Sequence, residues 1–294
     1  MRLNFSETEY ISPGHMACPG CGASLSMRHA LKIMGKDTII IMPACCWSII
    51  NGPYPTASLK VPLLNVPFAA AAACASGVRQ ALSAQGCENI RVMVWAGDGG
   101  TFDIGFQGLS GAAERGEDII YVCYDNEAYM NTGTQRSSST PFGAWTTTTP
   151  SGNRIIKKDL IEILRSHRSA YVATAVVTYP EDFQMKFEKA RSIKGFRFLN
   201  VLSVCPPGWR IDSQEGIHVS RMAVESGIFP LVETDEEGKL RLTYHPEHLI
   251  PVKDYIRAQG RFKSMTDSQI ADVQAQVIAR MRELGYLGSL KSVS

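Results

Sequence analysis

Two short polar blocks, Gly97-Asp98-Gly99-Gly100 and Asp125-Asn126-Glu127-Ala128, constrain this 294-residue chain more than any other feature. Each block follows an apolar run that is rich in β-branched residues, 90–96 for the first and 119–124 for the second. The segment between them, 102–115, has apolar residues at helical spacing, so the pattern predicts a strand–helix–strand unit. Neighbouring parallel strands end at the same edge of a sheet, where open α/β sheets bind ligands. We therefore expect the two blocks to lie side by side.

The residue types in these blocks indicate what could bind there. Glycines beside Asp98 allow the backbone to approach an anion closely, and the helix that follows offers unpaired N–H groups. One carboxylate, from Asp98, and one amide oxygen, from Asn126, are too few ligands for a closed protein cage. They suit Mg²⁺, which takes one or two carboxylates and completes its octahedron with phosphate oxygens. A glycine turn and an Asx turn without a ligand would use the same residues, but the position of both blocks at strand ends favours a site.

Composition excludes several other classes of function. The chain is 45% hydrophobic, enough for one large α/β domain or two small ones. Its formal charge is only +2, and it has no basic runs with interleaved aromatic residues, so we expect no role in binding nucleic acid. No apolar stretch reaches the roughly 18 residues that a membrane helix needs. The N-terminus does not resemble a signal segment, which predicts a cytoplasmic protein.

The eight cysteines are unevenly placed. In a reducing compartment they are expected to bind a metal or cluster rather than to form disulfides. Cys18-Pro19-Gly20-Cys21 is a tight turn, Cys46 follows an expected strand, and Cys205 follows another. Four thiolates from the ends of different elements can hold zinc or a [4Fe–4S] cluster, and their spacing leaves both open. A redox-active cluster would make chemical sense beside a cofactor that releases electrons.

Alternating strand and helix patterns continue to about residue 245, and a charged helical pattern follows at 267–284. We find no internal repeat, so the economical prediction is one α/β domain with a mostly parallel sheet, helices on both faces and a C-terminal helical tail. The run Lys157-Lys158-Asp159 predicts a solvated start of a helix.

Longer motifs carry a resemblance to a known family. Gly-Asp-Gly followed by Asn126 resembles the diphosphate-binding signature of thiamine diphosphate enzymes. Cys18-Pro19-Gly20-Cys21-Gly22, the run from Gly97 to Gly105, the run from Asp125 to Gly133 and Cys205-Pro206-Pro207-Gly208-Trp209 are similar, in the same order, to the β subunit of pyruvate:ferredoxin oxidoreductase (pyruvate synthase) and other 2-oxoacid:ferredoxin oxidoreductases. The similarity extends from about residue 14 to residue 261.

The resemblance implies a thiamine diphosphate-binding fold over residues 1–245, with a C-terminal helical arm over residues 246–294. It implies three cofactors: thiamine diphosphate, Mg²⁺ and one [4Fe–4S] cluster. The implied Mg²⁺ ligands are Asp98, Asn126 and the carbonyl of Ala128, and the implied cluster ligands are Cys18, Cys21, Cys46 and Cys205. The implied contacts to thiamine diphosphate are Ala23, Cys46, Gly97, Asp98, Gly99, Gly100, Asn126, Ala128, Tyr129, Met130, Asn131 and Thr132. In catalysis, Asn131 is implied to face the substrate carbonyl.

The activity implied is the coenzyme A-dependent oxidative decarboxylation of pyruvate, or the reverse synthesis, with electrons passed through the cluster to ferredoxin. The carboxylate that activates the cofactor belongs to a pyrimidine-binding domain in this family, and the chain has no second copy of its α/β pattern. It also lacks the repeated cysteine array of a two-cluster ferredoxin module. We therefore expect α-, γ- and δ-type partner subunits to supply both domains, and we expect the isolated chain to be inactive.

Alternatives remain within and outside this chemistry. Around the third cysteine the chain has Ala44-Cys45-Cys46-Trp47-Ser48, where many pyruvate-type β subunits carry Thr-Gly-Cys-Leu-Glu. Oxalate, phenylglyoxylate or a branched-chain 2-oxoacid are therefore alternative substrates, and Cys45 is an alternative ligand to its neighbour. A second alternative is a non-oxidative thiamine diphosphate decarboxylase or synthase subunit with zinc at the cysteines. A third is a nucleotide-binding scaffold in which Asp98 and Asn126 only cap turns.

Overall fold

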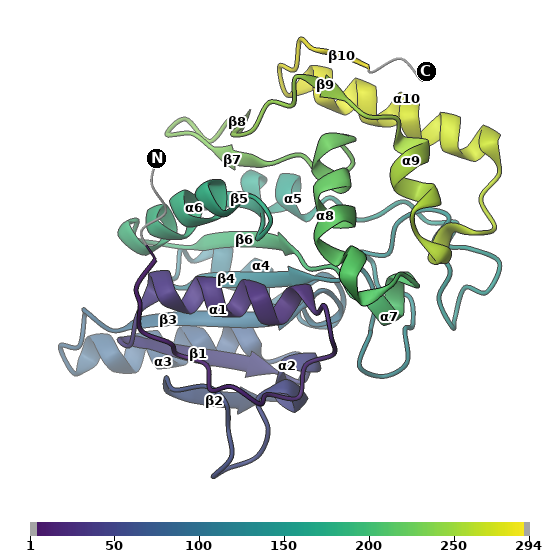
Figure 1. Cartoon of the computed structure of the whole chain (residues 1–294). Coiled ribbons are helices and arrows are strands. Elements are labelled where there is room, and N and C mark those ends of the chain that lie inside the picture. The colour runs from purple at the N-terminus through teal and green to yellow at the C-terminus, as the bar shows by residue number, and fades with distance from the viewer. Residues whose placement is uncertain (1–4, 291–294) are drawn as a thin grey trace.

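Six parallel strands form most of one eight-stranded sheet in the computed structural model, which describes residues 5–290 (Figure 1). In order across the sheet they are β2 (Leu63–Val66), β1 (Thr38–Pro43), β3 (Arg91–Gly97), β4 (Ile120–Asp125), β6 (Arg197–Leu202) and β5 (Tyr171–Val176). Two antiparallel strands, β7 (Val232–Thr234) and β8 (Leu240–Leu242), extend the sheet beyond β5. The predicted α/β fold with a mostly parallel sheet is confirmed.

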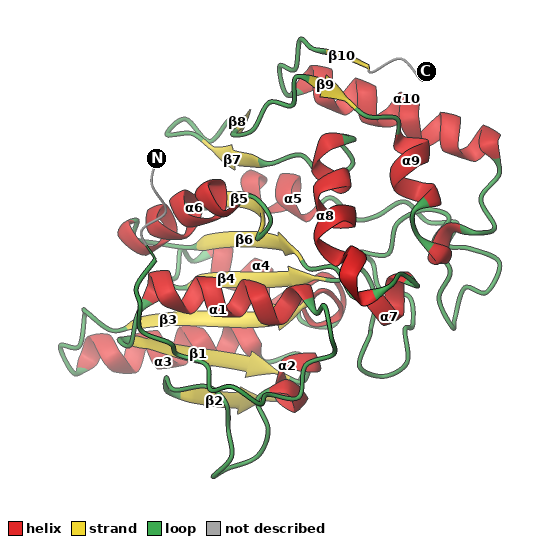
Figure 2. Ribbon diagram, viewed as in Figure 1, coloured by secondary structure: helices red, strands yellow, loops and turns green. Residues whose placement is uncertain are grey.

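Helices cover both faces of this sheet (Figure 2). One face is covered by α1 (Gly22–Met34) and α6 (Pro180–Ser192), the other by α3 (Ala71–Ala84), α4 (Phe106–Glu114) and α5 (Leu160–Ser166). Successive strand side chains point to opposite faces. In β3, for example, Val94 packs into the cluster that contains the side chains of α3, α4 and α5, whereas Trp95 packs into the cluster of α1 and α6.

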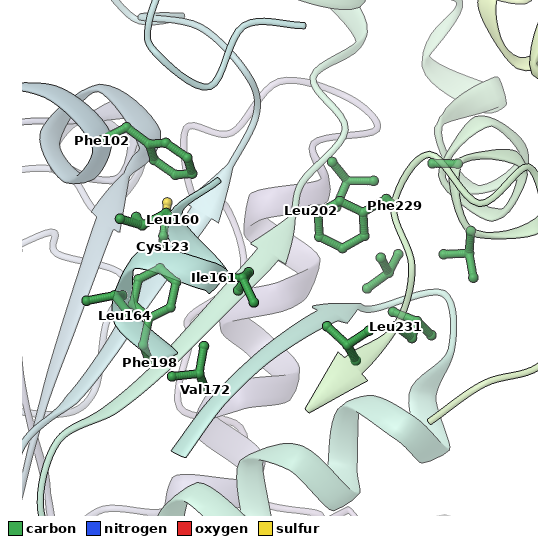
Figure 3. Close-up of a cluster of buried hydrophobic side chains, with 14 of the residues drawn as sticks. Phe102, Cys123, Leu160, Ile161, Leu164, Val172, Phe198, Leu202, Phe229 and Leu231 are labelled. Atoms are coloured by element: carbon green, nitrogen blue, oxygen red, sulfur yellow. The ribbon is translucent and has the colours of Figure 1, made fainter. Parts of the chain in front are cut away.

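The larger buried cluster connects the sheet to the turn that carries the first polar block. Figure 3 shows Phe102 together with Cys123 of β4 and Leu160 of α5, and Phe198 of β6 with Leu164 of α5. All five side chains are at most 2% exposed. Burying a side chain the size of Phe or Leu stabilises a fold by about 1.5–3 kcal/mol. The turn after β3 is therefore anchored in the core by Phe102.

Short elements lie where the parallel strands end (Figure 1). These are α2 (Cys46–Ile50), α7 (Pro206–Trp209), the 3₁₀ helix η2 (Ser213–Glu215) and α8 (Gly216–Glu225). The chain then forms β9 (His248–Leu249), α9 (Val252–Arg257), the 3₁₀ helix η3 (Gly260–Phe262), α10 (Asp267–Glu283) and β10 (Ser289–Leu290), which pairs with β9. Thr266 and Gln269 form a capping box at the start of α10.

The predicted C-terminal helical tail is present as α9 and α10. It packs on its own chain, because Tyr255 and Met281 belong to the same buried cluster as the sheet residues. The division of the chain at residue 246 stays a prediction. Across residues 5–290, no helix combines the length and the apolar character that crossing a bilayer requires.

The predicted helix over residues 102–115 is two elements in the structure. A π-helix, η1 (Gly99–Asp103), comes first, and α4 begins only at Phe106. The close packing around this turn requires two glycines, because a Cβ atom on Gly99 would overlap the ring of Tyr129 and one on Gly105 would overlap the carbonyl oxygen of Gly100. π-helical turns are rare and are frequent at functional sites. The apolar periodicity alone could not distinguish this turn from an ordinary helix start.

Candidate cofactor site

Asp98 and Asn126 lie side by side, as the sequence predicts. They follow β3 and β4, which are neighbours in the sheet with Gly97 opposite Tyr124. One terminal atom of the Asn126 amide lies 2.9 Å from Asp98 Oδ1 and 2.9 Å from the carbonyl oxygen of Ala128. Turned with its nitrogen inward, the amide would donate to both oxygens. Turned with its oxygen inward, it brings three oxygens together, an arrangement that a cation would stabilise.

The spacing of these oxygens matches the coordination sphere of magnesium. Mg²⁺ binds oxygens at 2.0–2.1 Å in an octahedron, so neighbouring ligands are about 2.9 Å apart. Burial, with the nearby charge of Asp125 adding to it, raises the pKa of Asp98 well above its usual range. A divalent cation would offset both effects and keep Asp98 ionised. The residues present therefore fit Mg²⁺.

Ser137, which we did not identify from the sequence, fixes the other oxygen of the aspartate. Its hydroxyl donates to Asp98 Oδ2 and accepts from the backbone N–H of Ser139 at 3.1 Å. Ser139 in turn donates to Asp125 Oδ1 at 2.6 Å. This serine-rich loop leaves Asp98 Oδ1 facing the amide of Asn126, which is the orientation a shared cation needs.

The residues after Asn126 form a short loop over the glycine turn. Ala128 is buried, Tyr129 and Met130 are partly buried, and Asn131 and Thr132 are exposed. The Tyr129 hydroxyl donates to Asp103 Oδ2 at 3.0 Å and so connects this loop to η1. The Met130 thioether occupies the space that a Cβ atom on residue 208 would need. The loop therefore contacts both the glycine turn and the turn that follows Cys205.

Two basic side chains and two buried carboxylates form a network of ion pairs beside this loop. The network corrects one prediction. Lys157 is only 27% exposed rather than freely solvated, and its Nζ lies 2.7 Å from Asp125 Oδ2 and 2.9 Å from Glu127 Oε1. Arg261 Nη2 lies 2.7 Å from Glu127 Oε2. Burial raises the pKa of Glu127, but Lys157 and then Arg261 more than offset this and hold its pKa below the ordinary value. No sequence pattern indicates this network, because its cations lie far along the chain from its carboxylates.

Three of the four predicted cluster cysteines are partly buried, and Cys18 is exposed. Burial first, and then the neighbouring thiols of Cys205, Cys45 and Cys21, raises the pKa of Cys46 to about 12. Burial likewise raises the pKa of Cys205 to about 11, with Cys21 and Cys18 contributing. The structure thus brings the four predicted thiols into one region. Within residues 5–290, no three His, Cys, Asp or Glu side chains converge closely enough to hold a single metal ion.

Close backbone packing holds the first two cysteines against the segment after β6. The backbone N–H of Gly22 donates to the carbonyl of Val204 at 2.9 Å. A Cβ atom on Gly22 would lie 2.7 Å from the Val204 nitrogen, and one on Gly20 would overlap the carbonyl of Ser213. These glycines explain how a turn before α1 reaches a turn after β6. Ala23, in the first turn of α1, accepts from the indole N–H of Trp47 at 3.2 Å.

Cys45 differs from its neighbour in its surroundings. It precedes α2, and its thiol pairs with the hydroxyl of Tyr124 in β4. Burial raises the pKa of the Cys45 thiol, whereas the Tyr124 contact lowers it. Cys123 is fully buried in the sheet core, as a small apolar residue would be.

Two cavities flank the site. One, of about 580 Å³, lies behind it and is bounded by Phe102, Glu127 and Lys157 together with residues of α5 and α10. The other, of about 430 Å³, is bounded by Cys18, Cys21 and the first turn of α8. The Asp98–Asn126 edge lies in neither lining, and Cys46 and Cys205 are also outside the second cavity.

Several known proteins resemble this chain in sequence. Residues 54–201 match the C-terminal TPP binding domain of thiamine pyrophosphate enzymes. The pyruvate synthase subunit PorB of Methanocaldococcus jannaschii is 47% identical, over 96% of this chain and 99% of the relative. The ketoisovalerate oxidoreductase subunit VorB of Pyrococcus furiosus is 44% identical, over 98% of this chain and 96% of the relative.

A solved structure shares the fold. The 2-oxoglutarate:ferredoxin oxidoreductase from Magnetococcus marinus aligns with a TM-score of 0.59 at 22% identity, covering 74% of this chain and 81% of that one. The predicted family and the predicted enzyme class, an oxidoreductase, are both confirmed. The chain belongs to the thiamine diphosphate-binding β subunits of the 2-oxoacid:ferredoxin oxidoreductase family.

Proposed function

We propose that this chain is the catalytic β subunit for coenzyme A-dependent oxidative decarboxylation of pyruvate, or the reverse synthesis, with electrons passed through a [4Fe–4S] cluster to ferredoxin. The observation that carries the proposal is the 2.9 Å spacing that joins Asp98 and Ala128 through the Asn126 amide. This spacing occurs at the carboxyl edge of a sheet whose family binds thiamine diphosphate.

Asp98, Asn126 and the carbonyl of Ala128 would hold Mg²⁺, and diphosphate oxygens would complete its octahedron. Ser137 keeps Asp98 in the orientation that the cation needs. When bound, thiamine diphosphate supplies the electron sink for the loss of carbon dioxide. The exposed Asn131, at the far end of the loop, is proposed to orient the 2-oxoacid carbonyl. The remaining cofactor contacts predicted from the sequence belong to this proposal.

Cys18, Cys21, Cys46 and Cys205 would hold the cluster. Two observations support this: the thiols act on one another electrostatically, and the charge of Asp98 also acts on Cys46. The second observation supports a short separation between the proposed cluster and the Asp98 end of the cofactor site, which electron transfer from the bound cofactor to the cluster would require. Of these four cysteines, Cys18 is the one that is exposed to solvent.

The names of the relatives suggest two candidate substrates for this chain. Pyruvate is favoured by relatives named as pyruvate synthase subunits, at up to 47% identity. A branched-chain 2-oxoacid is the second candidate, because relatives named as ketoisovalerate oxidoreductase subunits reach 45% identity.

We further propose that α-, γ- and δ-type subunits supply a pyrimidine-binding domain and a ferredoxin-like domain. The chain aligns with 99% of a relative that is itself named as a subunit, which supports a division of the activity among several chains. The isolated chain is then expected to be inactive, and full 2-oxoacid-dependent viologen reduction by the purified chain alone would contradict this.

The decisive experiment uses the complex purified with its partner subunits. We expect a brown protein with about four irons per β chain in addition to those of the ferredoxin-like domain, and coenzyme A-dependent viologen reduction with pyruvate. Faster reduction with 3-methyl-2-oxobutanoate would assign the branched-chain substrate instead. One zinc in place of the cluster, with carbon dioxide released and no acceptor reduced, would support the non-oxidative alternative. Absence of calorimetric binding of thiamine diphosphate with Mg²⁺ would support the scaffold alternative.

Separate Cys45→Ala and Cys46→Ala variants test the third ligand. Loss of iron only in Cys46→Ala is the expected result. Loss of iron only in Cys45→Ala would transfer the role to its neighbour.

A further inference from the structure

Arg261 is a buried cation that no sequence motif singled out. It lies in η3, near the end of the chain, and is only 2% exposed. Its Nη2 forms an ion contact with Glu127 Oε2 at 2.7 Å, without the alignment of a hydrogen bond. Its guanidinium carbon lies 3.7 Å from the ring centre of Trp209, and its Nε donates to Gln259 Oε1 at 2.9 Å. One side chain from the C-terminal region therefore touches two distant segments.

Both segments lead directly to the proposed cofactor ligands. Glu127 lies between Asn126 and Ala128, two of the proposed Mg²⁺ ligands. The indole N–H of Trp209 donates to the carbonyl of Asn126 at 2.9 Å. The backbone N–H of Trp209 donates to the carbonyl of Cys205, a proposed cluster ligand, at 2.8 Å.

Glu127 also needs an external constraint. Its φ of 69° lies in the left-handed region, which is unfavourable for a residue with a side chain and persists only where the surroundings hold it. Lys157 contacts one of its carboxylate oxygens, Oε1, and Arg261 contacts the other, Oε2. These two ion contacts help to hold the Glu127 backbone in the conformation that turns Asn126 and the Ala128 carbonyl toward Asp98.

We infer that Arg261 is a positioning residue that couples the two cofactor sites: it fixes the Mg²⁺ loop through Glu127 and the Cys205 turn through Trp209. The inference rests on the proposed function, since it assumes that both cofactors bind. Lys157 provides a contrast, because its ion pairs reach only the loop, at Asp125 and Glu127. Of the two cations, Arg261 is the one that also stacks on Trp209.

The test compares Arg261→Met and Arg261→Lys in the complex with its partner subunits, well below the melting temperature of each variant. Calorimetry measures the dissociation constant of thiamine diphosphate at limiting and at saturating Mg²⁺. Electron paramagnetic resonance measures the spectrum and midpoint potential of the reduced cluster next to the cofactor. Arg257→Met is the matched control, since Arg257 is an exposed arginine of α9 that pairs with Asp267 at 3.0 Å.

Arg261→Met is expected to weaken thiamine diphosphate binding about tenfold at limiting Mg²⁺, in the range found for residues that support metal ligands. Saturating Mg²⁺ should recover part of this loss, and the cluster spectrum should shift. Arg261→Lys keeps a charge for Glu127 but cannot stack flat on the Trp209 ring. It should therefore bind thiamine diphosphate almost as the wild type does, while the cluster spectrum still shifts. Arg257→Met should change neither.

The outcomes separate this inference from the function on which it rests. A wild-type complex that binds no thiamine diphosphate, or holds no cluster in this chain, would overturn the proposed function. If the wild type binds both and Arg261→Met matches it in both measurements, Arg261 merely fills the core and the inference is wrong. A change in only one of the two measurements in Arg261→Met would contradict the coupling. If that variant does not fold, an unshifted cluster spectrum in Arg261→Lys overturns the inference instead.

Discussion

Replacing Lys157 with methionine removes a cation that two buried carboxylates share. Asp125 is fully buried and Glu127 is 4% exposed, and both contact the Lys157 ammonium within 3 Å. Breaking a buried ion pair by removing one partner typically costs about 3–5 kcal/mol, because the remaining charge is left uncompensated. Arg261 still faces Glu127, and Asp125 keeps its bonds from Ser139 and a backbone N–H, so we expect the lower half of this range.

The assay is thermal unfolding of the full chain at several pH values. An unfolding entropy of about 2.1 cal/mol/K per residue makes about 1 kcal/mol correspond to roughly 1.6 °C in a chain of 294 residues, so Lys157→Met should melt roughly 5–6 °C below the wild type at pH 7. Lys158→Met is the control. In the wild type the Lys158 ammonium donates to the Phe102 carbonyl and lies over the Phe106 ring. Together these two contacts are worth about 1–2 kcal/mol.

The pH dependence gives the sharper test. In the wild type the pKa of Glu127 is held below its ordinary value, so its contribution to stability is present above the unfolded-state pKa and is lost as pH falls through the folded-state pKa. Without Lys157 that pKa rises, because the largest lowering influence is gone. The difference in melting temperature between Lys157→Met and the wild type should therefore shrink in acid. A difference that is absent at pH 7, or that grows as pH falls, would refute the reasoning.

Three further predictions address the site itself. Asp98→Asn keeps the shape of the side chain but removes its charge. It should weaken the binding of thiamine diphosphate with Mg²⁺ by more than the roughly 10–100-fold loss that is typical when a residue supporting a metal ligand is changed. An unchanged dissociation constant in calorimetry would contradict the metal site. Cys205→Ala should lower the iron bound per chain, whereas Cys74→Ala, in α3, should not; equal iron in both variants would count against the cluster assignment. Gly105→Ala places a Cβ atom against the Gly100 carbonyl and should cost about 1–3 kcal/mol. This cost corresponds to a fall in melting temperature of roughly 2–5 °C, and wild-type melting would show that η1 can adapt.

The sheet and the meeting of Asp98 with Asn126 could be predicted because both depend on local patterns. Apolar runs of five to seven residues define β3 and β4, and the parallel arrangement then forces their carboxyl ends together. The glycine turn was placed correctly for the same reason. Its π-helical form was not, because an i→i+5 turn differs from an α-helical one in backbone spacing rather than in residue type.

The supporting contacts could not be predicted because they join residues that are distant in sequence. Ser137 reaches Asp98 across 39 residues, and Arg261 reaches Glu127 across a still longer separation. Lys157 looked like the solvated start of a helix because polarity indicates exposure on average. Its two ion pairs follow from where Asp125 and Glu127 lie, and only the folded chain shows that.

The wide turn of η1 also fixes how many residues this part of the chain can contain. Each residue advances an α-helix by about 100° around its axis. Removing one residue from the stretch between Gly99 and Asp103 would leave an ordinary α-helical turn. The residues before Gly99 would then be rotated by about 100° relative to α4. Phe102 anchors the stretch in the core, so the rotation would fall on Asp98 and swing its carboxylate away from Asn126. We therefore expect insertions and deletions to be tolerated in the outer loops but not in η1 or in its connection to α4.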